Sequence, residues 1–152
     1  MIVYHGSGEI VEYPAIRKTG YTKDFSWGFY CTCDLRQAER WAQKKQTPIV
    51  NVYEYLPNSH LNVLKFAEVN DAWLDFVMTC RMGTVHGYDL VEGPMADDQI
   101  WLYFTEWERG DISREEFLML AKFRHPTHQI SFHTLRAIDC LHFKEAVRYD
   151  KK

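Results

Sequence analysis

Two stretches decide the fold of this chain: Met1-Ile2-Val3-Tyr4-His5-Gly6-Ser7 and Trp27-Gly28-Phe29-Tyr30-Cys31-Thr32-Cys33-Asp34. The first predicts a strand over residues 1–6, where Gly6 permits a turn at the end. The second predicts a strand over Phe29–Cys33 and then a helix that Asp34 caps. Residues 8–27 contain glycines, a proline and little periodicity, so they predict a long functional loop.

The rest of the chain mixes helices and strands without regular alternation. Capping residues and apolar spacing predict further helices that begin at Asn70, Asp97-Asp98, Ser113 and Thr134. Alternating or apolar runs predict strands at Ile49–Tyr55, His60–Phe66, Tyr88–Met95, Gln129–His133 and Leu141–Arg148. This order predicts one α+β domain over residues 1–150 rather than a series of parallel βαβ units.

The first predicted helix carries a capping box and an apolar stripe. Gln37 stands three residues after Asp34, which is the spacing of an Asp-x-x-Gln box. The stripe is predicted from helical spacing and consists of Leu35, Ala38, Trp41 and Ala42.

Composition excludes several classes of protein. The chain has 152 residues, of which 46% are hydrophobic and 15% aromatic, so global disorder is not expected. Its formal net charge of -3 gives no general electrostatic case for nucleic-acid or membrane binding. The sequence has no apolar run of membrane-spanning length and no signal-peptide pattern at Met1, so we expect a cytoplasmic protein that does not contact a membrane.

Cysteine and histidine spacing gives no metal motif. Cys31 and Cys33 would point to one face of a strand, which is half of a metal site. No second pair follows at zinc-finger spacing. Other candidate ligands are His125, His128, His133 and His142, but small buried side chains and loop histidines are the better explanation of these residues. We therefore expect no metal cofactor.

His5-Gly6-Ser7 and Gly28-Phe29-Tyr30, with Trp41 eleven residues beyond Tyr30, resemble the histidine–tyrosine class of ADP-ribosyltransferases. This class includes the poly(ADP-ribose) polymerases and diphtheria-like toxins. The whole chain looks closest to a bacterial family of small ADP-ribosyltransferase-like domains of unknown function. The resemblance implies a split mixed β-sheet with flanking helices, and it rests on Val3–Ser7, Asp24–Trp41, Tyr88–Asp98 and Gln129–Phe143.

The resemblance also implies a role for each motif residue, with NAD as the substrate. His5 would hydrogen-bond the adenosine-side ribose of NAD. The backbone of Gly6 would hold the nicotinamide carboxamide, and Ser7 would add a polar contact. Tyr30 and Trp41 would flank the nicotinamide ring.

The sequence departs from the family at the late strand that usually supplies a catalytic Glu. Gln129 occupies the matching position. A Gln can orient a ribose hydroxyl but cannot take a proton. Three interpretations stay open: Gln129 serves a slower or different transfer, another acid replaces the Glu, or the fold binds nucleotide without turnover. The nearest alternative acids are Asp97, Asp98 and Glu92.

The function implied by the resemblance is mono-ADP-ribosylation by a toxin or effector. The enzyme would pass ADP-ribose from NAD to a macromolecular acceptor, and an antitoxin partner would neutralise it. An NAD glycohydrolase and a non-catalytic domain that binds nucleotide or a partner are the alternatives. Each candidate residue also has an ordinary structural explanation, such as a core aromatic at Tyr30 or a helix-start acid at Asp97.

Overall fold

Two β-sheets organise the chain, whose computed structural model describes residues 1–18 and 23–152. The first sheet is antiparallel, in the order β1-β3-β7, from Ile2–Ser7, Ile49–Tyr55 and Leu141–Arg148. The second has the order β2-β6-β5-β4, from Phe29–Cys31, Gln129–Phe132, Leu90–Gly93 and Val63–Lys65. Only β4 and β5 pair in parallel among these strands.

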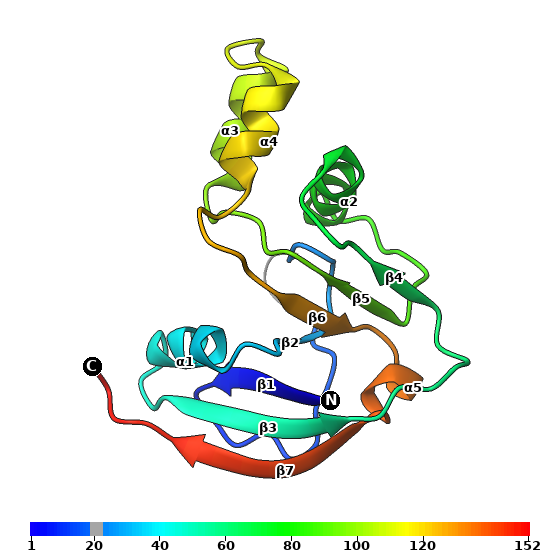
Figure 1. Cartoon of the computed structure of the whole chain (residues 1–152), viewed down its shortest axis with the longest axis vertical. Coiled ribbons are helices and arrows are strands. Elements are labelled where there is room, and N and C mark those ends of the chain that lie inside the picture. Colours follow the sequence, from blue (N-terminus) through cyan, green and yellow to red (C-terminus); the bar gives the residue numbers. More distant parts are fainter. Residues whose placement is uncertain (19–22) are drawn as a thin grey trace.

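Five helices accompany the sheets in the described part of the chain, so the predicted α+β class is confirmed. They are α1 (Leu35–Gln43), α2 (Asp71–Arg81), α3 (Ile100–Glu108), α4 (Arg114–Ala121) and α5 (Leu135–Ile138). Figure 1 shows α1 beside the first sheet and α2 beside the second, while α3 and α4 form a hairpin that projects from the body.

The two sheets meet at an antiparallel bridge between Tyr4 of β1 and Thr32. The Tyr4 N–H donates to the Thr32 carbonyl at 2.8 Å, and the Thr32 N–H donates to the Tyr4 carbonyl at 2.9 Å. The described residues of β1 and β2 form no further backbone pairs, so the strands separate beyond this bridge. His5 and Tyr30 lie at the start of the split.

Apolar clusters pack the sheets and helices together. One contains residues of both sheets, including the fully buried Val3, Tyr53, Ile130 and Phe132. A second packs the apolar face of α2 against β5 and the α3–α4 hairpin, and it includes Tyr30. A smaller one joins α1 to β3. The apolar spacing that predicts α2 is therefore confirmed as a buried face, formed by Trp73, Leu74, Val77 and Met78.

The predicted capping box of α1 is wrong in its second half. Asp34 accepts hydrogen bonds from the N–H groups of Arg36 and Gln37, as expected of a cap. The Gln37 side chain instead forms paired hydrogen bonds with the His128 backbone. The apolar stripe is only partly buried, since Leu35 is 38% exposed.

Of the other predicted caps and boundaries, some are confirmed and some are wrong. The caps at Asn70, Ser113 and Thr134 are confirmed, each by a side-chain hydrogen bond to the helix backbone. The helix expected at Asp97-Asp98 begins at Ile100, because Asp97 closes a turn by accepting from the Gln99 N–H at 2.9 Å. The second, fourth, fifth and sixth strands are shorter than predicted.

The expected shared face of Cys31 and Cys33 is wrong. β2 ends at Cys31, which is buried, and Cys33 is exposed beyond the strand. Within residues 1–18 and 23–152, no group of three or more His, Cys, Asp or Glu side chains is arranged to hold a metal ion. No helix in the described chain has the length and apolar character to cross a membrane.

Candidate functional site

A pocket of about 640 Å³ opens where the two sheets separate. This volume lies within the range of roughly 300–1,000 Å³ that small-molecule sites occupy. Its lining comes from β1, β2, α1, α2, β6 and the segments that follow β1, α1 and β5. Most of the residues predicted from sequence line it, although they are spread over most of the chain: His5, Gly6, Ser7, Tyr30, Trp41, Asp98 and Gln129.

His5 links the two strands at the pocket. Its Nδ1 lies 2.6 Å from the Tyr30 carbonyl oxygen, and its ring packs on Phe29 with a centroid distance of 4.2 Å. Burial lowers the pKa of His5 to about 4, although the bond to Tyr30 opposes this shift. The neutral ring must donate from Nδ1 because a carbonyl only accepts, so Nε2 is left as an acceptor.

Gly6 lies where α1 packs against β1. A Cβ at this position would collide with the Ala38 carbonyl oxygen and approach the Ala42 nitrogen to 2.8 Å. Glycine is therefore required by the close approach of helix and strand, whatever its backbone binds. The neighbouring Ser7 accepts a hydrogen bond from the Glu9 N–H at 3.2 Å and so shapes the loop at the pocket edge.

Tyr30 is both a pocket residue and a core residue. It is 6% exposed, and burial raises the pKa of its hydroxyl well above the ordinary value. The hydroxyl donates to the Ser26 carbonyl at 2.5 Å and accepts from the Phe25 N–H at 3.0 Å. Lys23 lies over the ring, 5.0 Å from its centroid. The ring face is thus covered by a cation in this structure.

The segment from Asp24 to Gly28 is held by the nearby Tyr30 and by two histidines from distant parts of the chain. Three successive carbonyls, from Phe25, Ser26 and Trp27, accept hydrogen bonds from His86, Tyr30 and His133 respectively. Ser26 has a positive φ of 76°, which a residue with a side chain rarely adopts. These contacts keep a strained turn in place at the pocket wall.

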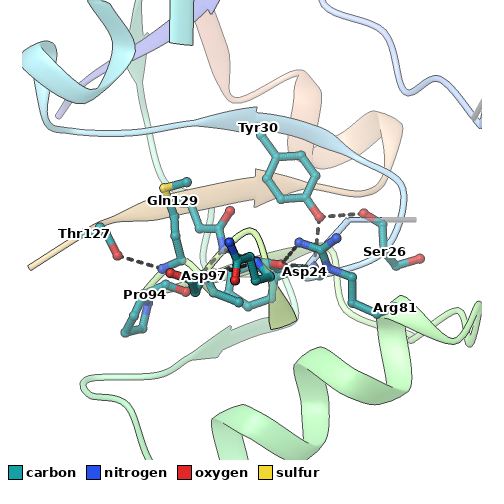
Figure 2. A network of polar contacts seen from close by, with 12 residues as sticks. Asp24, Ser26, Tyr30, Arg81, Pro94, Asp97, Thr127 and Gln129 are labelled. Atoms are coloured by element: carbon teal, nitrogen blue, oxygen red, sulfur yellow. Dashed lines mark hydrogen bonds and ion pairs between the residues drawn. The ribbon is translucent and has the colours of Figure 1, made fainter. Parts of the chain in front are cut away.

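Gln129 meets a buried carboxylate in the pocket. Its Nε2 donates to Asp24 at 3.0 Å and to the Pro94 carbonyl at 3.2 Å. Asp24 is 5% exposed and also accepts from Arg81 and from the Ala96 N–H. Figure 2 shows Asp24 between Gln129 and Arg81, with Tyr30 nearby.

The three acids suggested from sequence have different surroundings. Asp98 lines the pocket and is exposed, and no described residue hydrogen-bonds its carboxylate. Asp97 lines a separate groove beside α4, where its carboxylate caps the turn before α3. Glu92 does not line the pocket; its carboxylate accepts from His128 Nε2 at 2.9 Å. Asp97 and Glu92 are therefore removed as pocket acids.

Positive side chains gather in the pocket of this net-negative protein. Five cations line it, namely Arg17, Lys23, Lys44, Lys45 and Arg81. Arg17 pairs with Glu9 and Arg81 with Asp24, which leaves three lysines against Asp98 among the described lining residues. Burial and the nearby Lys45 lower the pKa of Lys23. The pocket therefore favours an anionic ligand.

Sequence reasoning missed three residues of this site. Asp24 stands in a quoted motif but was given no role. Arg81 was not named, although it follows Val77 by four residues and therefore continues the apolar face of its helix, where a cation needs a partner. Trp27 also lines the pocket, and its Nε1 is a buried side-chain donor without a partner among the described residues. Such orphaned donors are uncommon in folded proteins, so this atom has capacity for one more acceptor.

The sequence model of a family described as a protein of unknown function, DUF3990, matches residues 1–143. The chain belongs to the DUF3990 family. No curated protein and no solved structure matches this DUF3990 protein. The expected membership of a family of unknown function over nearly the full length is confirmed. The link to ADP-ribosyltransferases and to their fold stays a prediction.

Proposed function

We propose that this DUF3990 protein binds NAD in the pocket between the sheets and transfers ADP-ribose to a macromolecular acceptor, with release of nicotinamide. The observation that carries the proposal is the convergence of His5, Gly6, Tyr30, Trp41 and Gln129 on one pocket. The resemblance names these positions from short motifs, whereas their common location depends on the whole fold.

The chemistry suits a site without a strong general acid. The bond between nicotinamide and ribose breaks with its electron pair moving to the nicotinamide nitrogen, so a cationic ring leaves as a neutral molecule. The protein has to orient the ring and ribose and stabilise positive charge that develops on the ribose. Side chains that clamp and hydrogen-bond NAD are sufficient for this step.

The charge of the pocket supports a dinucleotide ligand. The diphosphate of NAD carries two negative charges, and Lys23, Lys44 and Lys45 supply the compensating positive charge. The Trp27 Nε1 group provides a further neutral donor in the same wall. In this arrangement a ribose hydroxyl of NAD donates a hydrogen bond to Nε2 of His5.

Two polar side chains of the pocket could act where the molecule that receives ADP-ribose attacks. Gln129 offers an amide that orients a ribose hydroxyl, and Asp98 offers a carboxylate that can take a proton from the attacking nucleophile. We assign the role of acid or base to Asp98 rather than to Asp97 or Glu92, because only Asp98 of these three lines the pocket. A toxin or effector role, with an antitoxin that binds the protein, is part of the same proposal.

Two other functions follow if the acceptor step differs. With water as the acceptor the protein is an NAD glycohydrolase, and without turnover it is a nucleotide-binding or partner-binding domain. The neutral side chain at Gln129 is the observation that favours these alternatives over efficient transfer.

The test is incubation of the purified protein with NAD labelled on the adenine, with and without cell lysate, while free nicotinamide is measured by chromatography. Nicotinamide release that rises with lysate, with label on a macromolecule, supports transfer. Release with free labelled ADP-ribose supports hydrolysis. No release by folded protein overturns both enzymatic readings.

A matched pair of variants tests the pocket assignment. His5→Ala removes one hydrogen bond to NAD and should raise its dissociation constant about tenfold. His142→Ala is the control, since His142 is exposed on β7 outside the pocket. Equal NAD affinity in both variants would remove His5 from the site.

A further inference from the structure

We infer that Asp24 is a positioning residue that holds the Gln129 amide with its oxygen toward the pocket and excludes a carboxylate from position 129. The inference rests on the proposed function for its catalytic consequence. Its geometric part concerns only how Asp24, Arg81 and Gln129 pack, and it is testable without NAD.

The orientation of Gln129 follows from its two neighbours. The Asp24 carboxylate and the Pro94 carbonyl are both acceptors, and the two lie 3.0 Å and 3.2 Å from the amide nitrogen. Both N–H bonds of the amide are used in these contacts. The amide oxygen then has to point the other way, so Gln129 presents an acceptor to the pocket that it lines.

Asp24 is occupied on both oxygens. Its Oδ1 accepts from Arg81 Nε at 2.9 Å and Nη2 at 2.5 Å, while Oδ2 accepts from the Ala96 N–H at 2.8 Å and from Gln129. Four hydrogen bonds use the acceptor capacity of a carboxylate, and Arg81 balances its charge. Asp24 is therefore held as a support for Gln129 rather than as a base.

The same two acceptors disfavour a Glu at position 129, which is the residue that the ADP-ribosyltransferases resembled by this chain usually carry there. A Glu at position 129 would place an ionised oxygen against the Asp24 carboxylate and the Pro94 carbonyl, where only a donor fits. Two carboxylates in such contact cannot both ionise without a large penalty, so one of them would keep its proton. The pocket is thus built for an uncharged acceptor at this position.

The network extends from Gln129 to Tyr30. Asp24 directly precedes Phe25 and Ser26, whose backbone groups bond the Tyr30 hydroxyl. Figure 2 shows this path from the Tyr30 ring through the turn to Asp24 and Gln129. Loss of the Asp24 contact would therefore disturb the orientation of both pocket residues.

The geometric test compares Gln129→Glu with the double variant Asp24→Asn and Gln129→Glu. In the single variant Asp24 raises the pKa of the new carboxyl, so it stays protonated at pH 5 and can donate to Asp24. At pH 8 it ionises, and Tm should fall by about 5–10 °C more than at pH 5, each relative to wild type. In the double variant this pH-dependent difference should become clearly smaller, because no second carboxylate remains and only burial and the Pro94 carbonyl oppose ionisation.

The catalytic test uses Asp24→Asn, with Asp89→Asn as the control. Asp89 is also a buried aspartate bonded to an arginine, Arg136, but it does not line the pocket. Both variants should lose stability. Only Asp24→Asn should lower kcat for nicotinamide release, by about tenfold or more, while the dissociation constant of NAD changes less than threefold.

Specific outcomes overturn the inference. Equal Tm differences from wild type at pH 5 and pH 8 for Gln129→Glu would show that Asp24 does not face position 129. Equal kcat in Asp24→Asn and Asp89→Asn would reduce Asp24 to a structural role. If wild-type protein releases no nicotinamide, the proposed function fails, and the Tm comparison still decides the geometry.

Discussion

The Nδ1–H of His5 donates a hydrogen bond to the Tyr30 carbonyl, 2.6 Å away, immediately beyond the last backbone pair that joins the two sheets. A side chain thus continues the link between β1 and β2 where the backbone ladder stops. The bond selects one tautomer of His5 and leaves Nε2 as an acceptor in the pocket. The link between β1 and β2 and the acceptor atom in the pocket therefore both depend on His5 being neutral.

Stability should fall with acid because of two buried histidines. Burial lowers the pKa of both His5 and His133 to about 4, so the unfolded chain, with histidine pKa values near 6.5, binds more protons between these limits. The free energy of unfolding should therefore decrease as pH falls from about 6.5 to about 4, by up to about 1.4 kcal/mol per pH unit for each histidine.

Urea unfolding between pH 4 and pH 7 measures this slope, and His133→Gln supplies the comparison. This variant removes one of the two groups and should reduce the slope accordingly. An unchanged slope would mean that His133 is not held in its neutral form by the fold.

Gly6→Ala should destabilise the protein by about 3 kcal/mol, because the added methyl collides with the backbone of α1. Gly87→Ala is the matched control, since a Cβ at Gly87 meets nothing within 4 Å. Thermal unfolding of the two variants gives the comparison. Similar Tm values would contradict the close packing of α1 on β1.

Lys23→Ala should strengthen binding of 1-methylnicotinamide about threefold. This probe is a cationic ring without phosphates, and the Lys23 ammonium now lies over the Tyr30 ring that would stack on it. Calorimetry measures the affinity, with Lys45→Ala as a control that changes a lining lysine that does not lie over this ring. Weaker binding in Lys23→Ala would show that Lys23 does not compete for the ring face.

Asp98→Asn should lower transfer of ADP-ribose about tenfold or more and leave NAD affinity nearly unchanged, because Asp98 is an exposed carboxylate of the pocket that, unlike Glu9, forms no ion pair with a described residue. Asp97→Asn should lose some stability through the weakened turn before α3 but keep its turnover. Label transfer from NAD to lysate provides the assay. Loss of transfer in Asp97→Asn alone would reverse the assignment of the two neighbours.

Local signals in the sequence were sufficient to predict helix caps, where the capping side chain and the backbone group that it bonds lie within one helical turn. Asn70, Ser113 and Thr134 cap their helices because the groups they bond are three residues away. Gln37 had the same local option, but its amide fits the backbone of His128, which no local pattern reveals. Positions 19–22 of the predicted loop lie outside the described residues.

Only some residues of the site could be predicted from the sequence, for a related reason. His5, Tyr30 and Gln129 were identified through a family resemblance, and the fold brings them to one pocket. The acid that would replace the Glu was sought among Asp97, Asp98 and Glu92, of which Asp98 lines the pocket. No local pattern indicated that Asp24, more than a hundred positions away in the chain, accepts a hydrogen bond from Gln129. Sequence separation carries no information about which acid folds against a given amide.

The sequence by itself determined the α+β class, most helices and strands, membership of the DUF3990 family and the residues that make the pocket a candidate for NAD. The class and the elements follow from periodicity and caps, which act over a few residues, whereas the family and the candidate site residues come from similarity to other sequences. Only the tertiary structure decided that Asp24 orients Gln129, that Lys23 covers Tyr30 and that Asp97 faces another groove. Each depends on contacts between segments whose approach is set by packing of the two sheets and their helices.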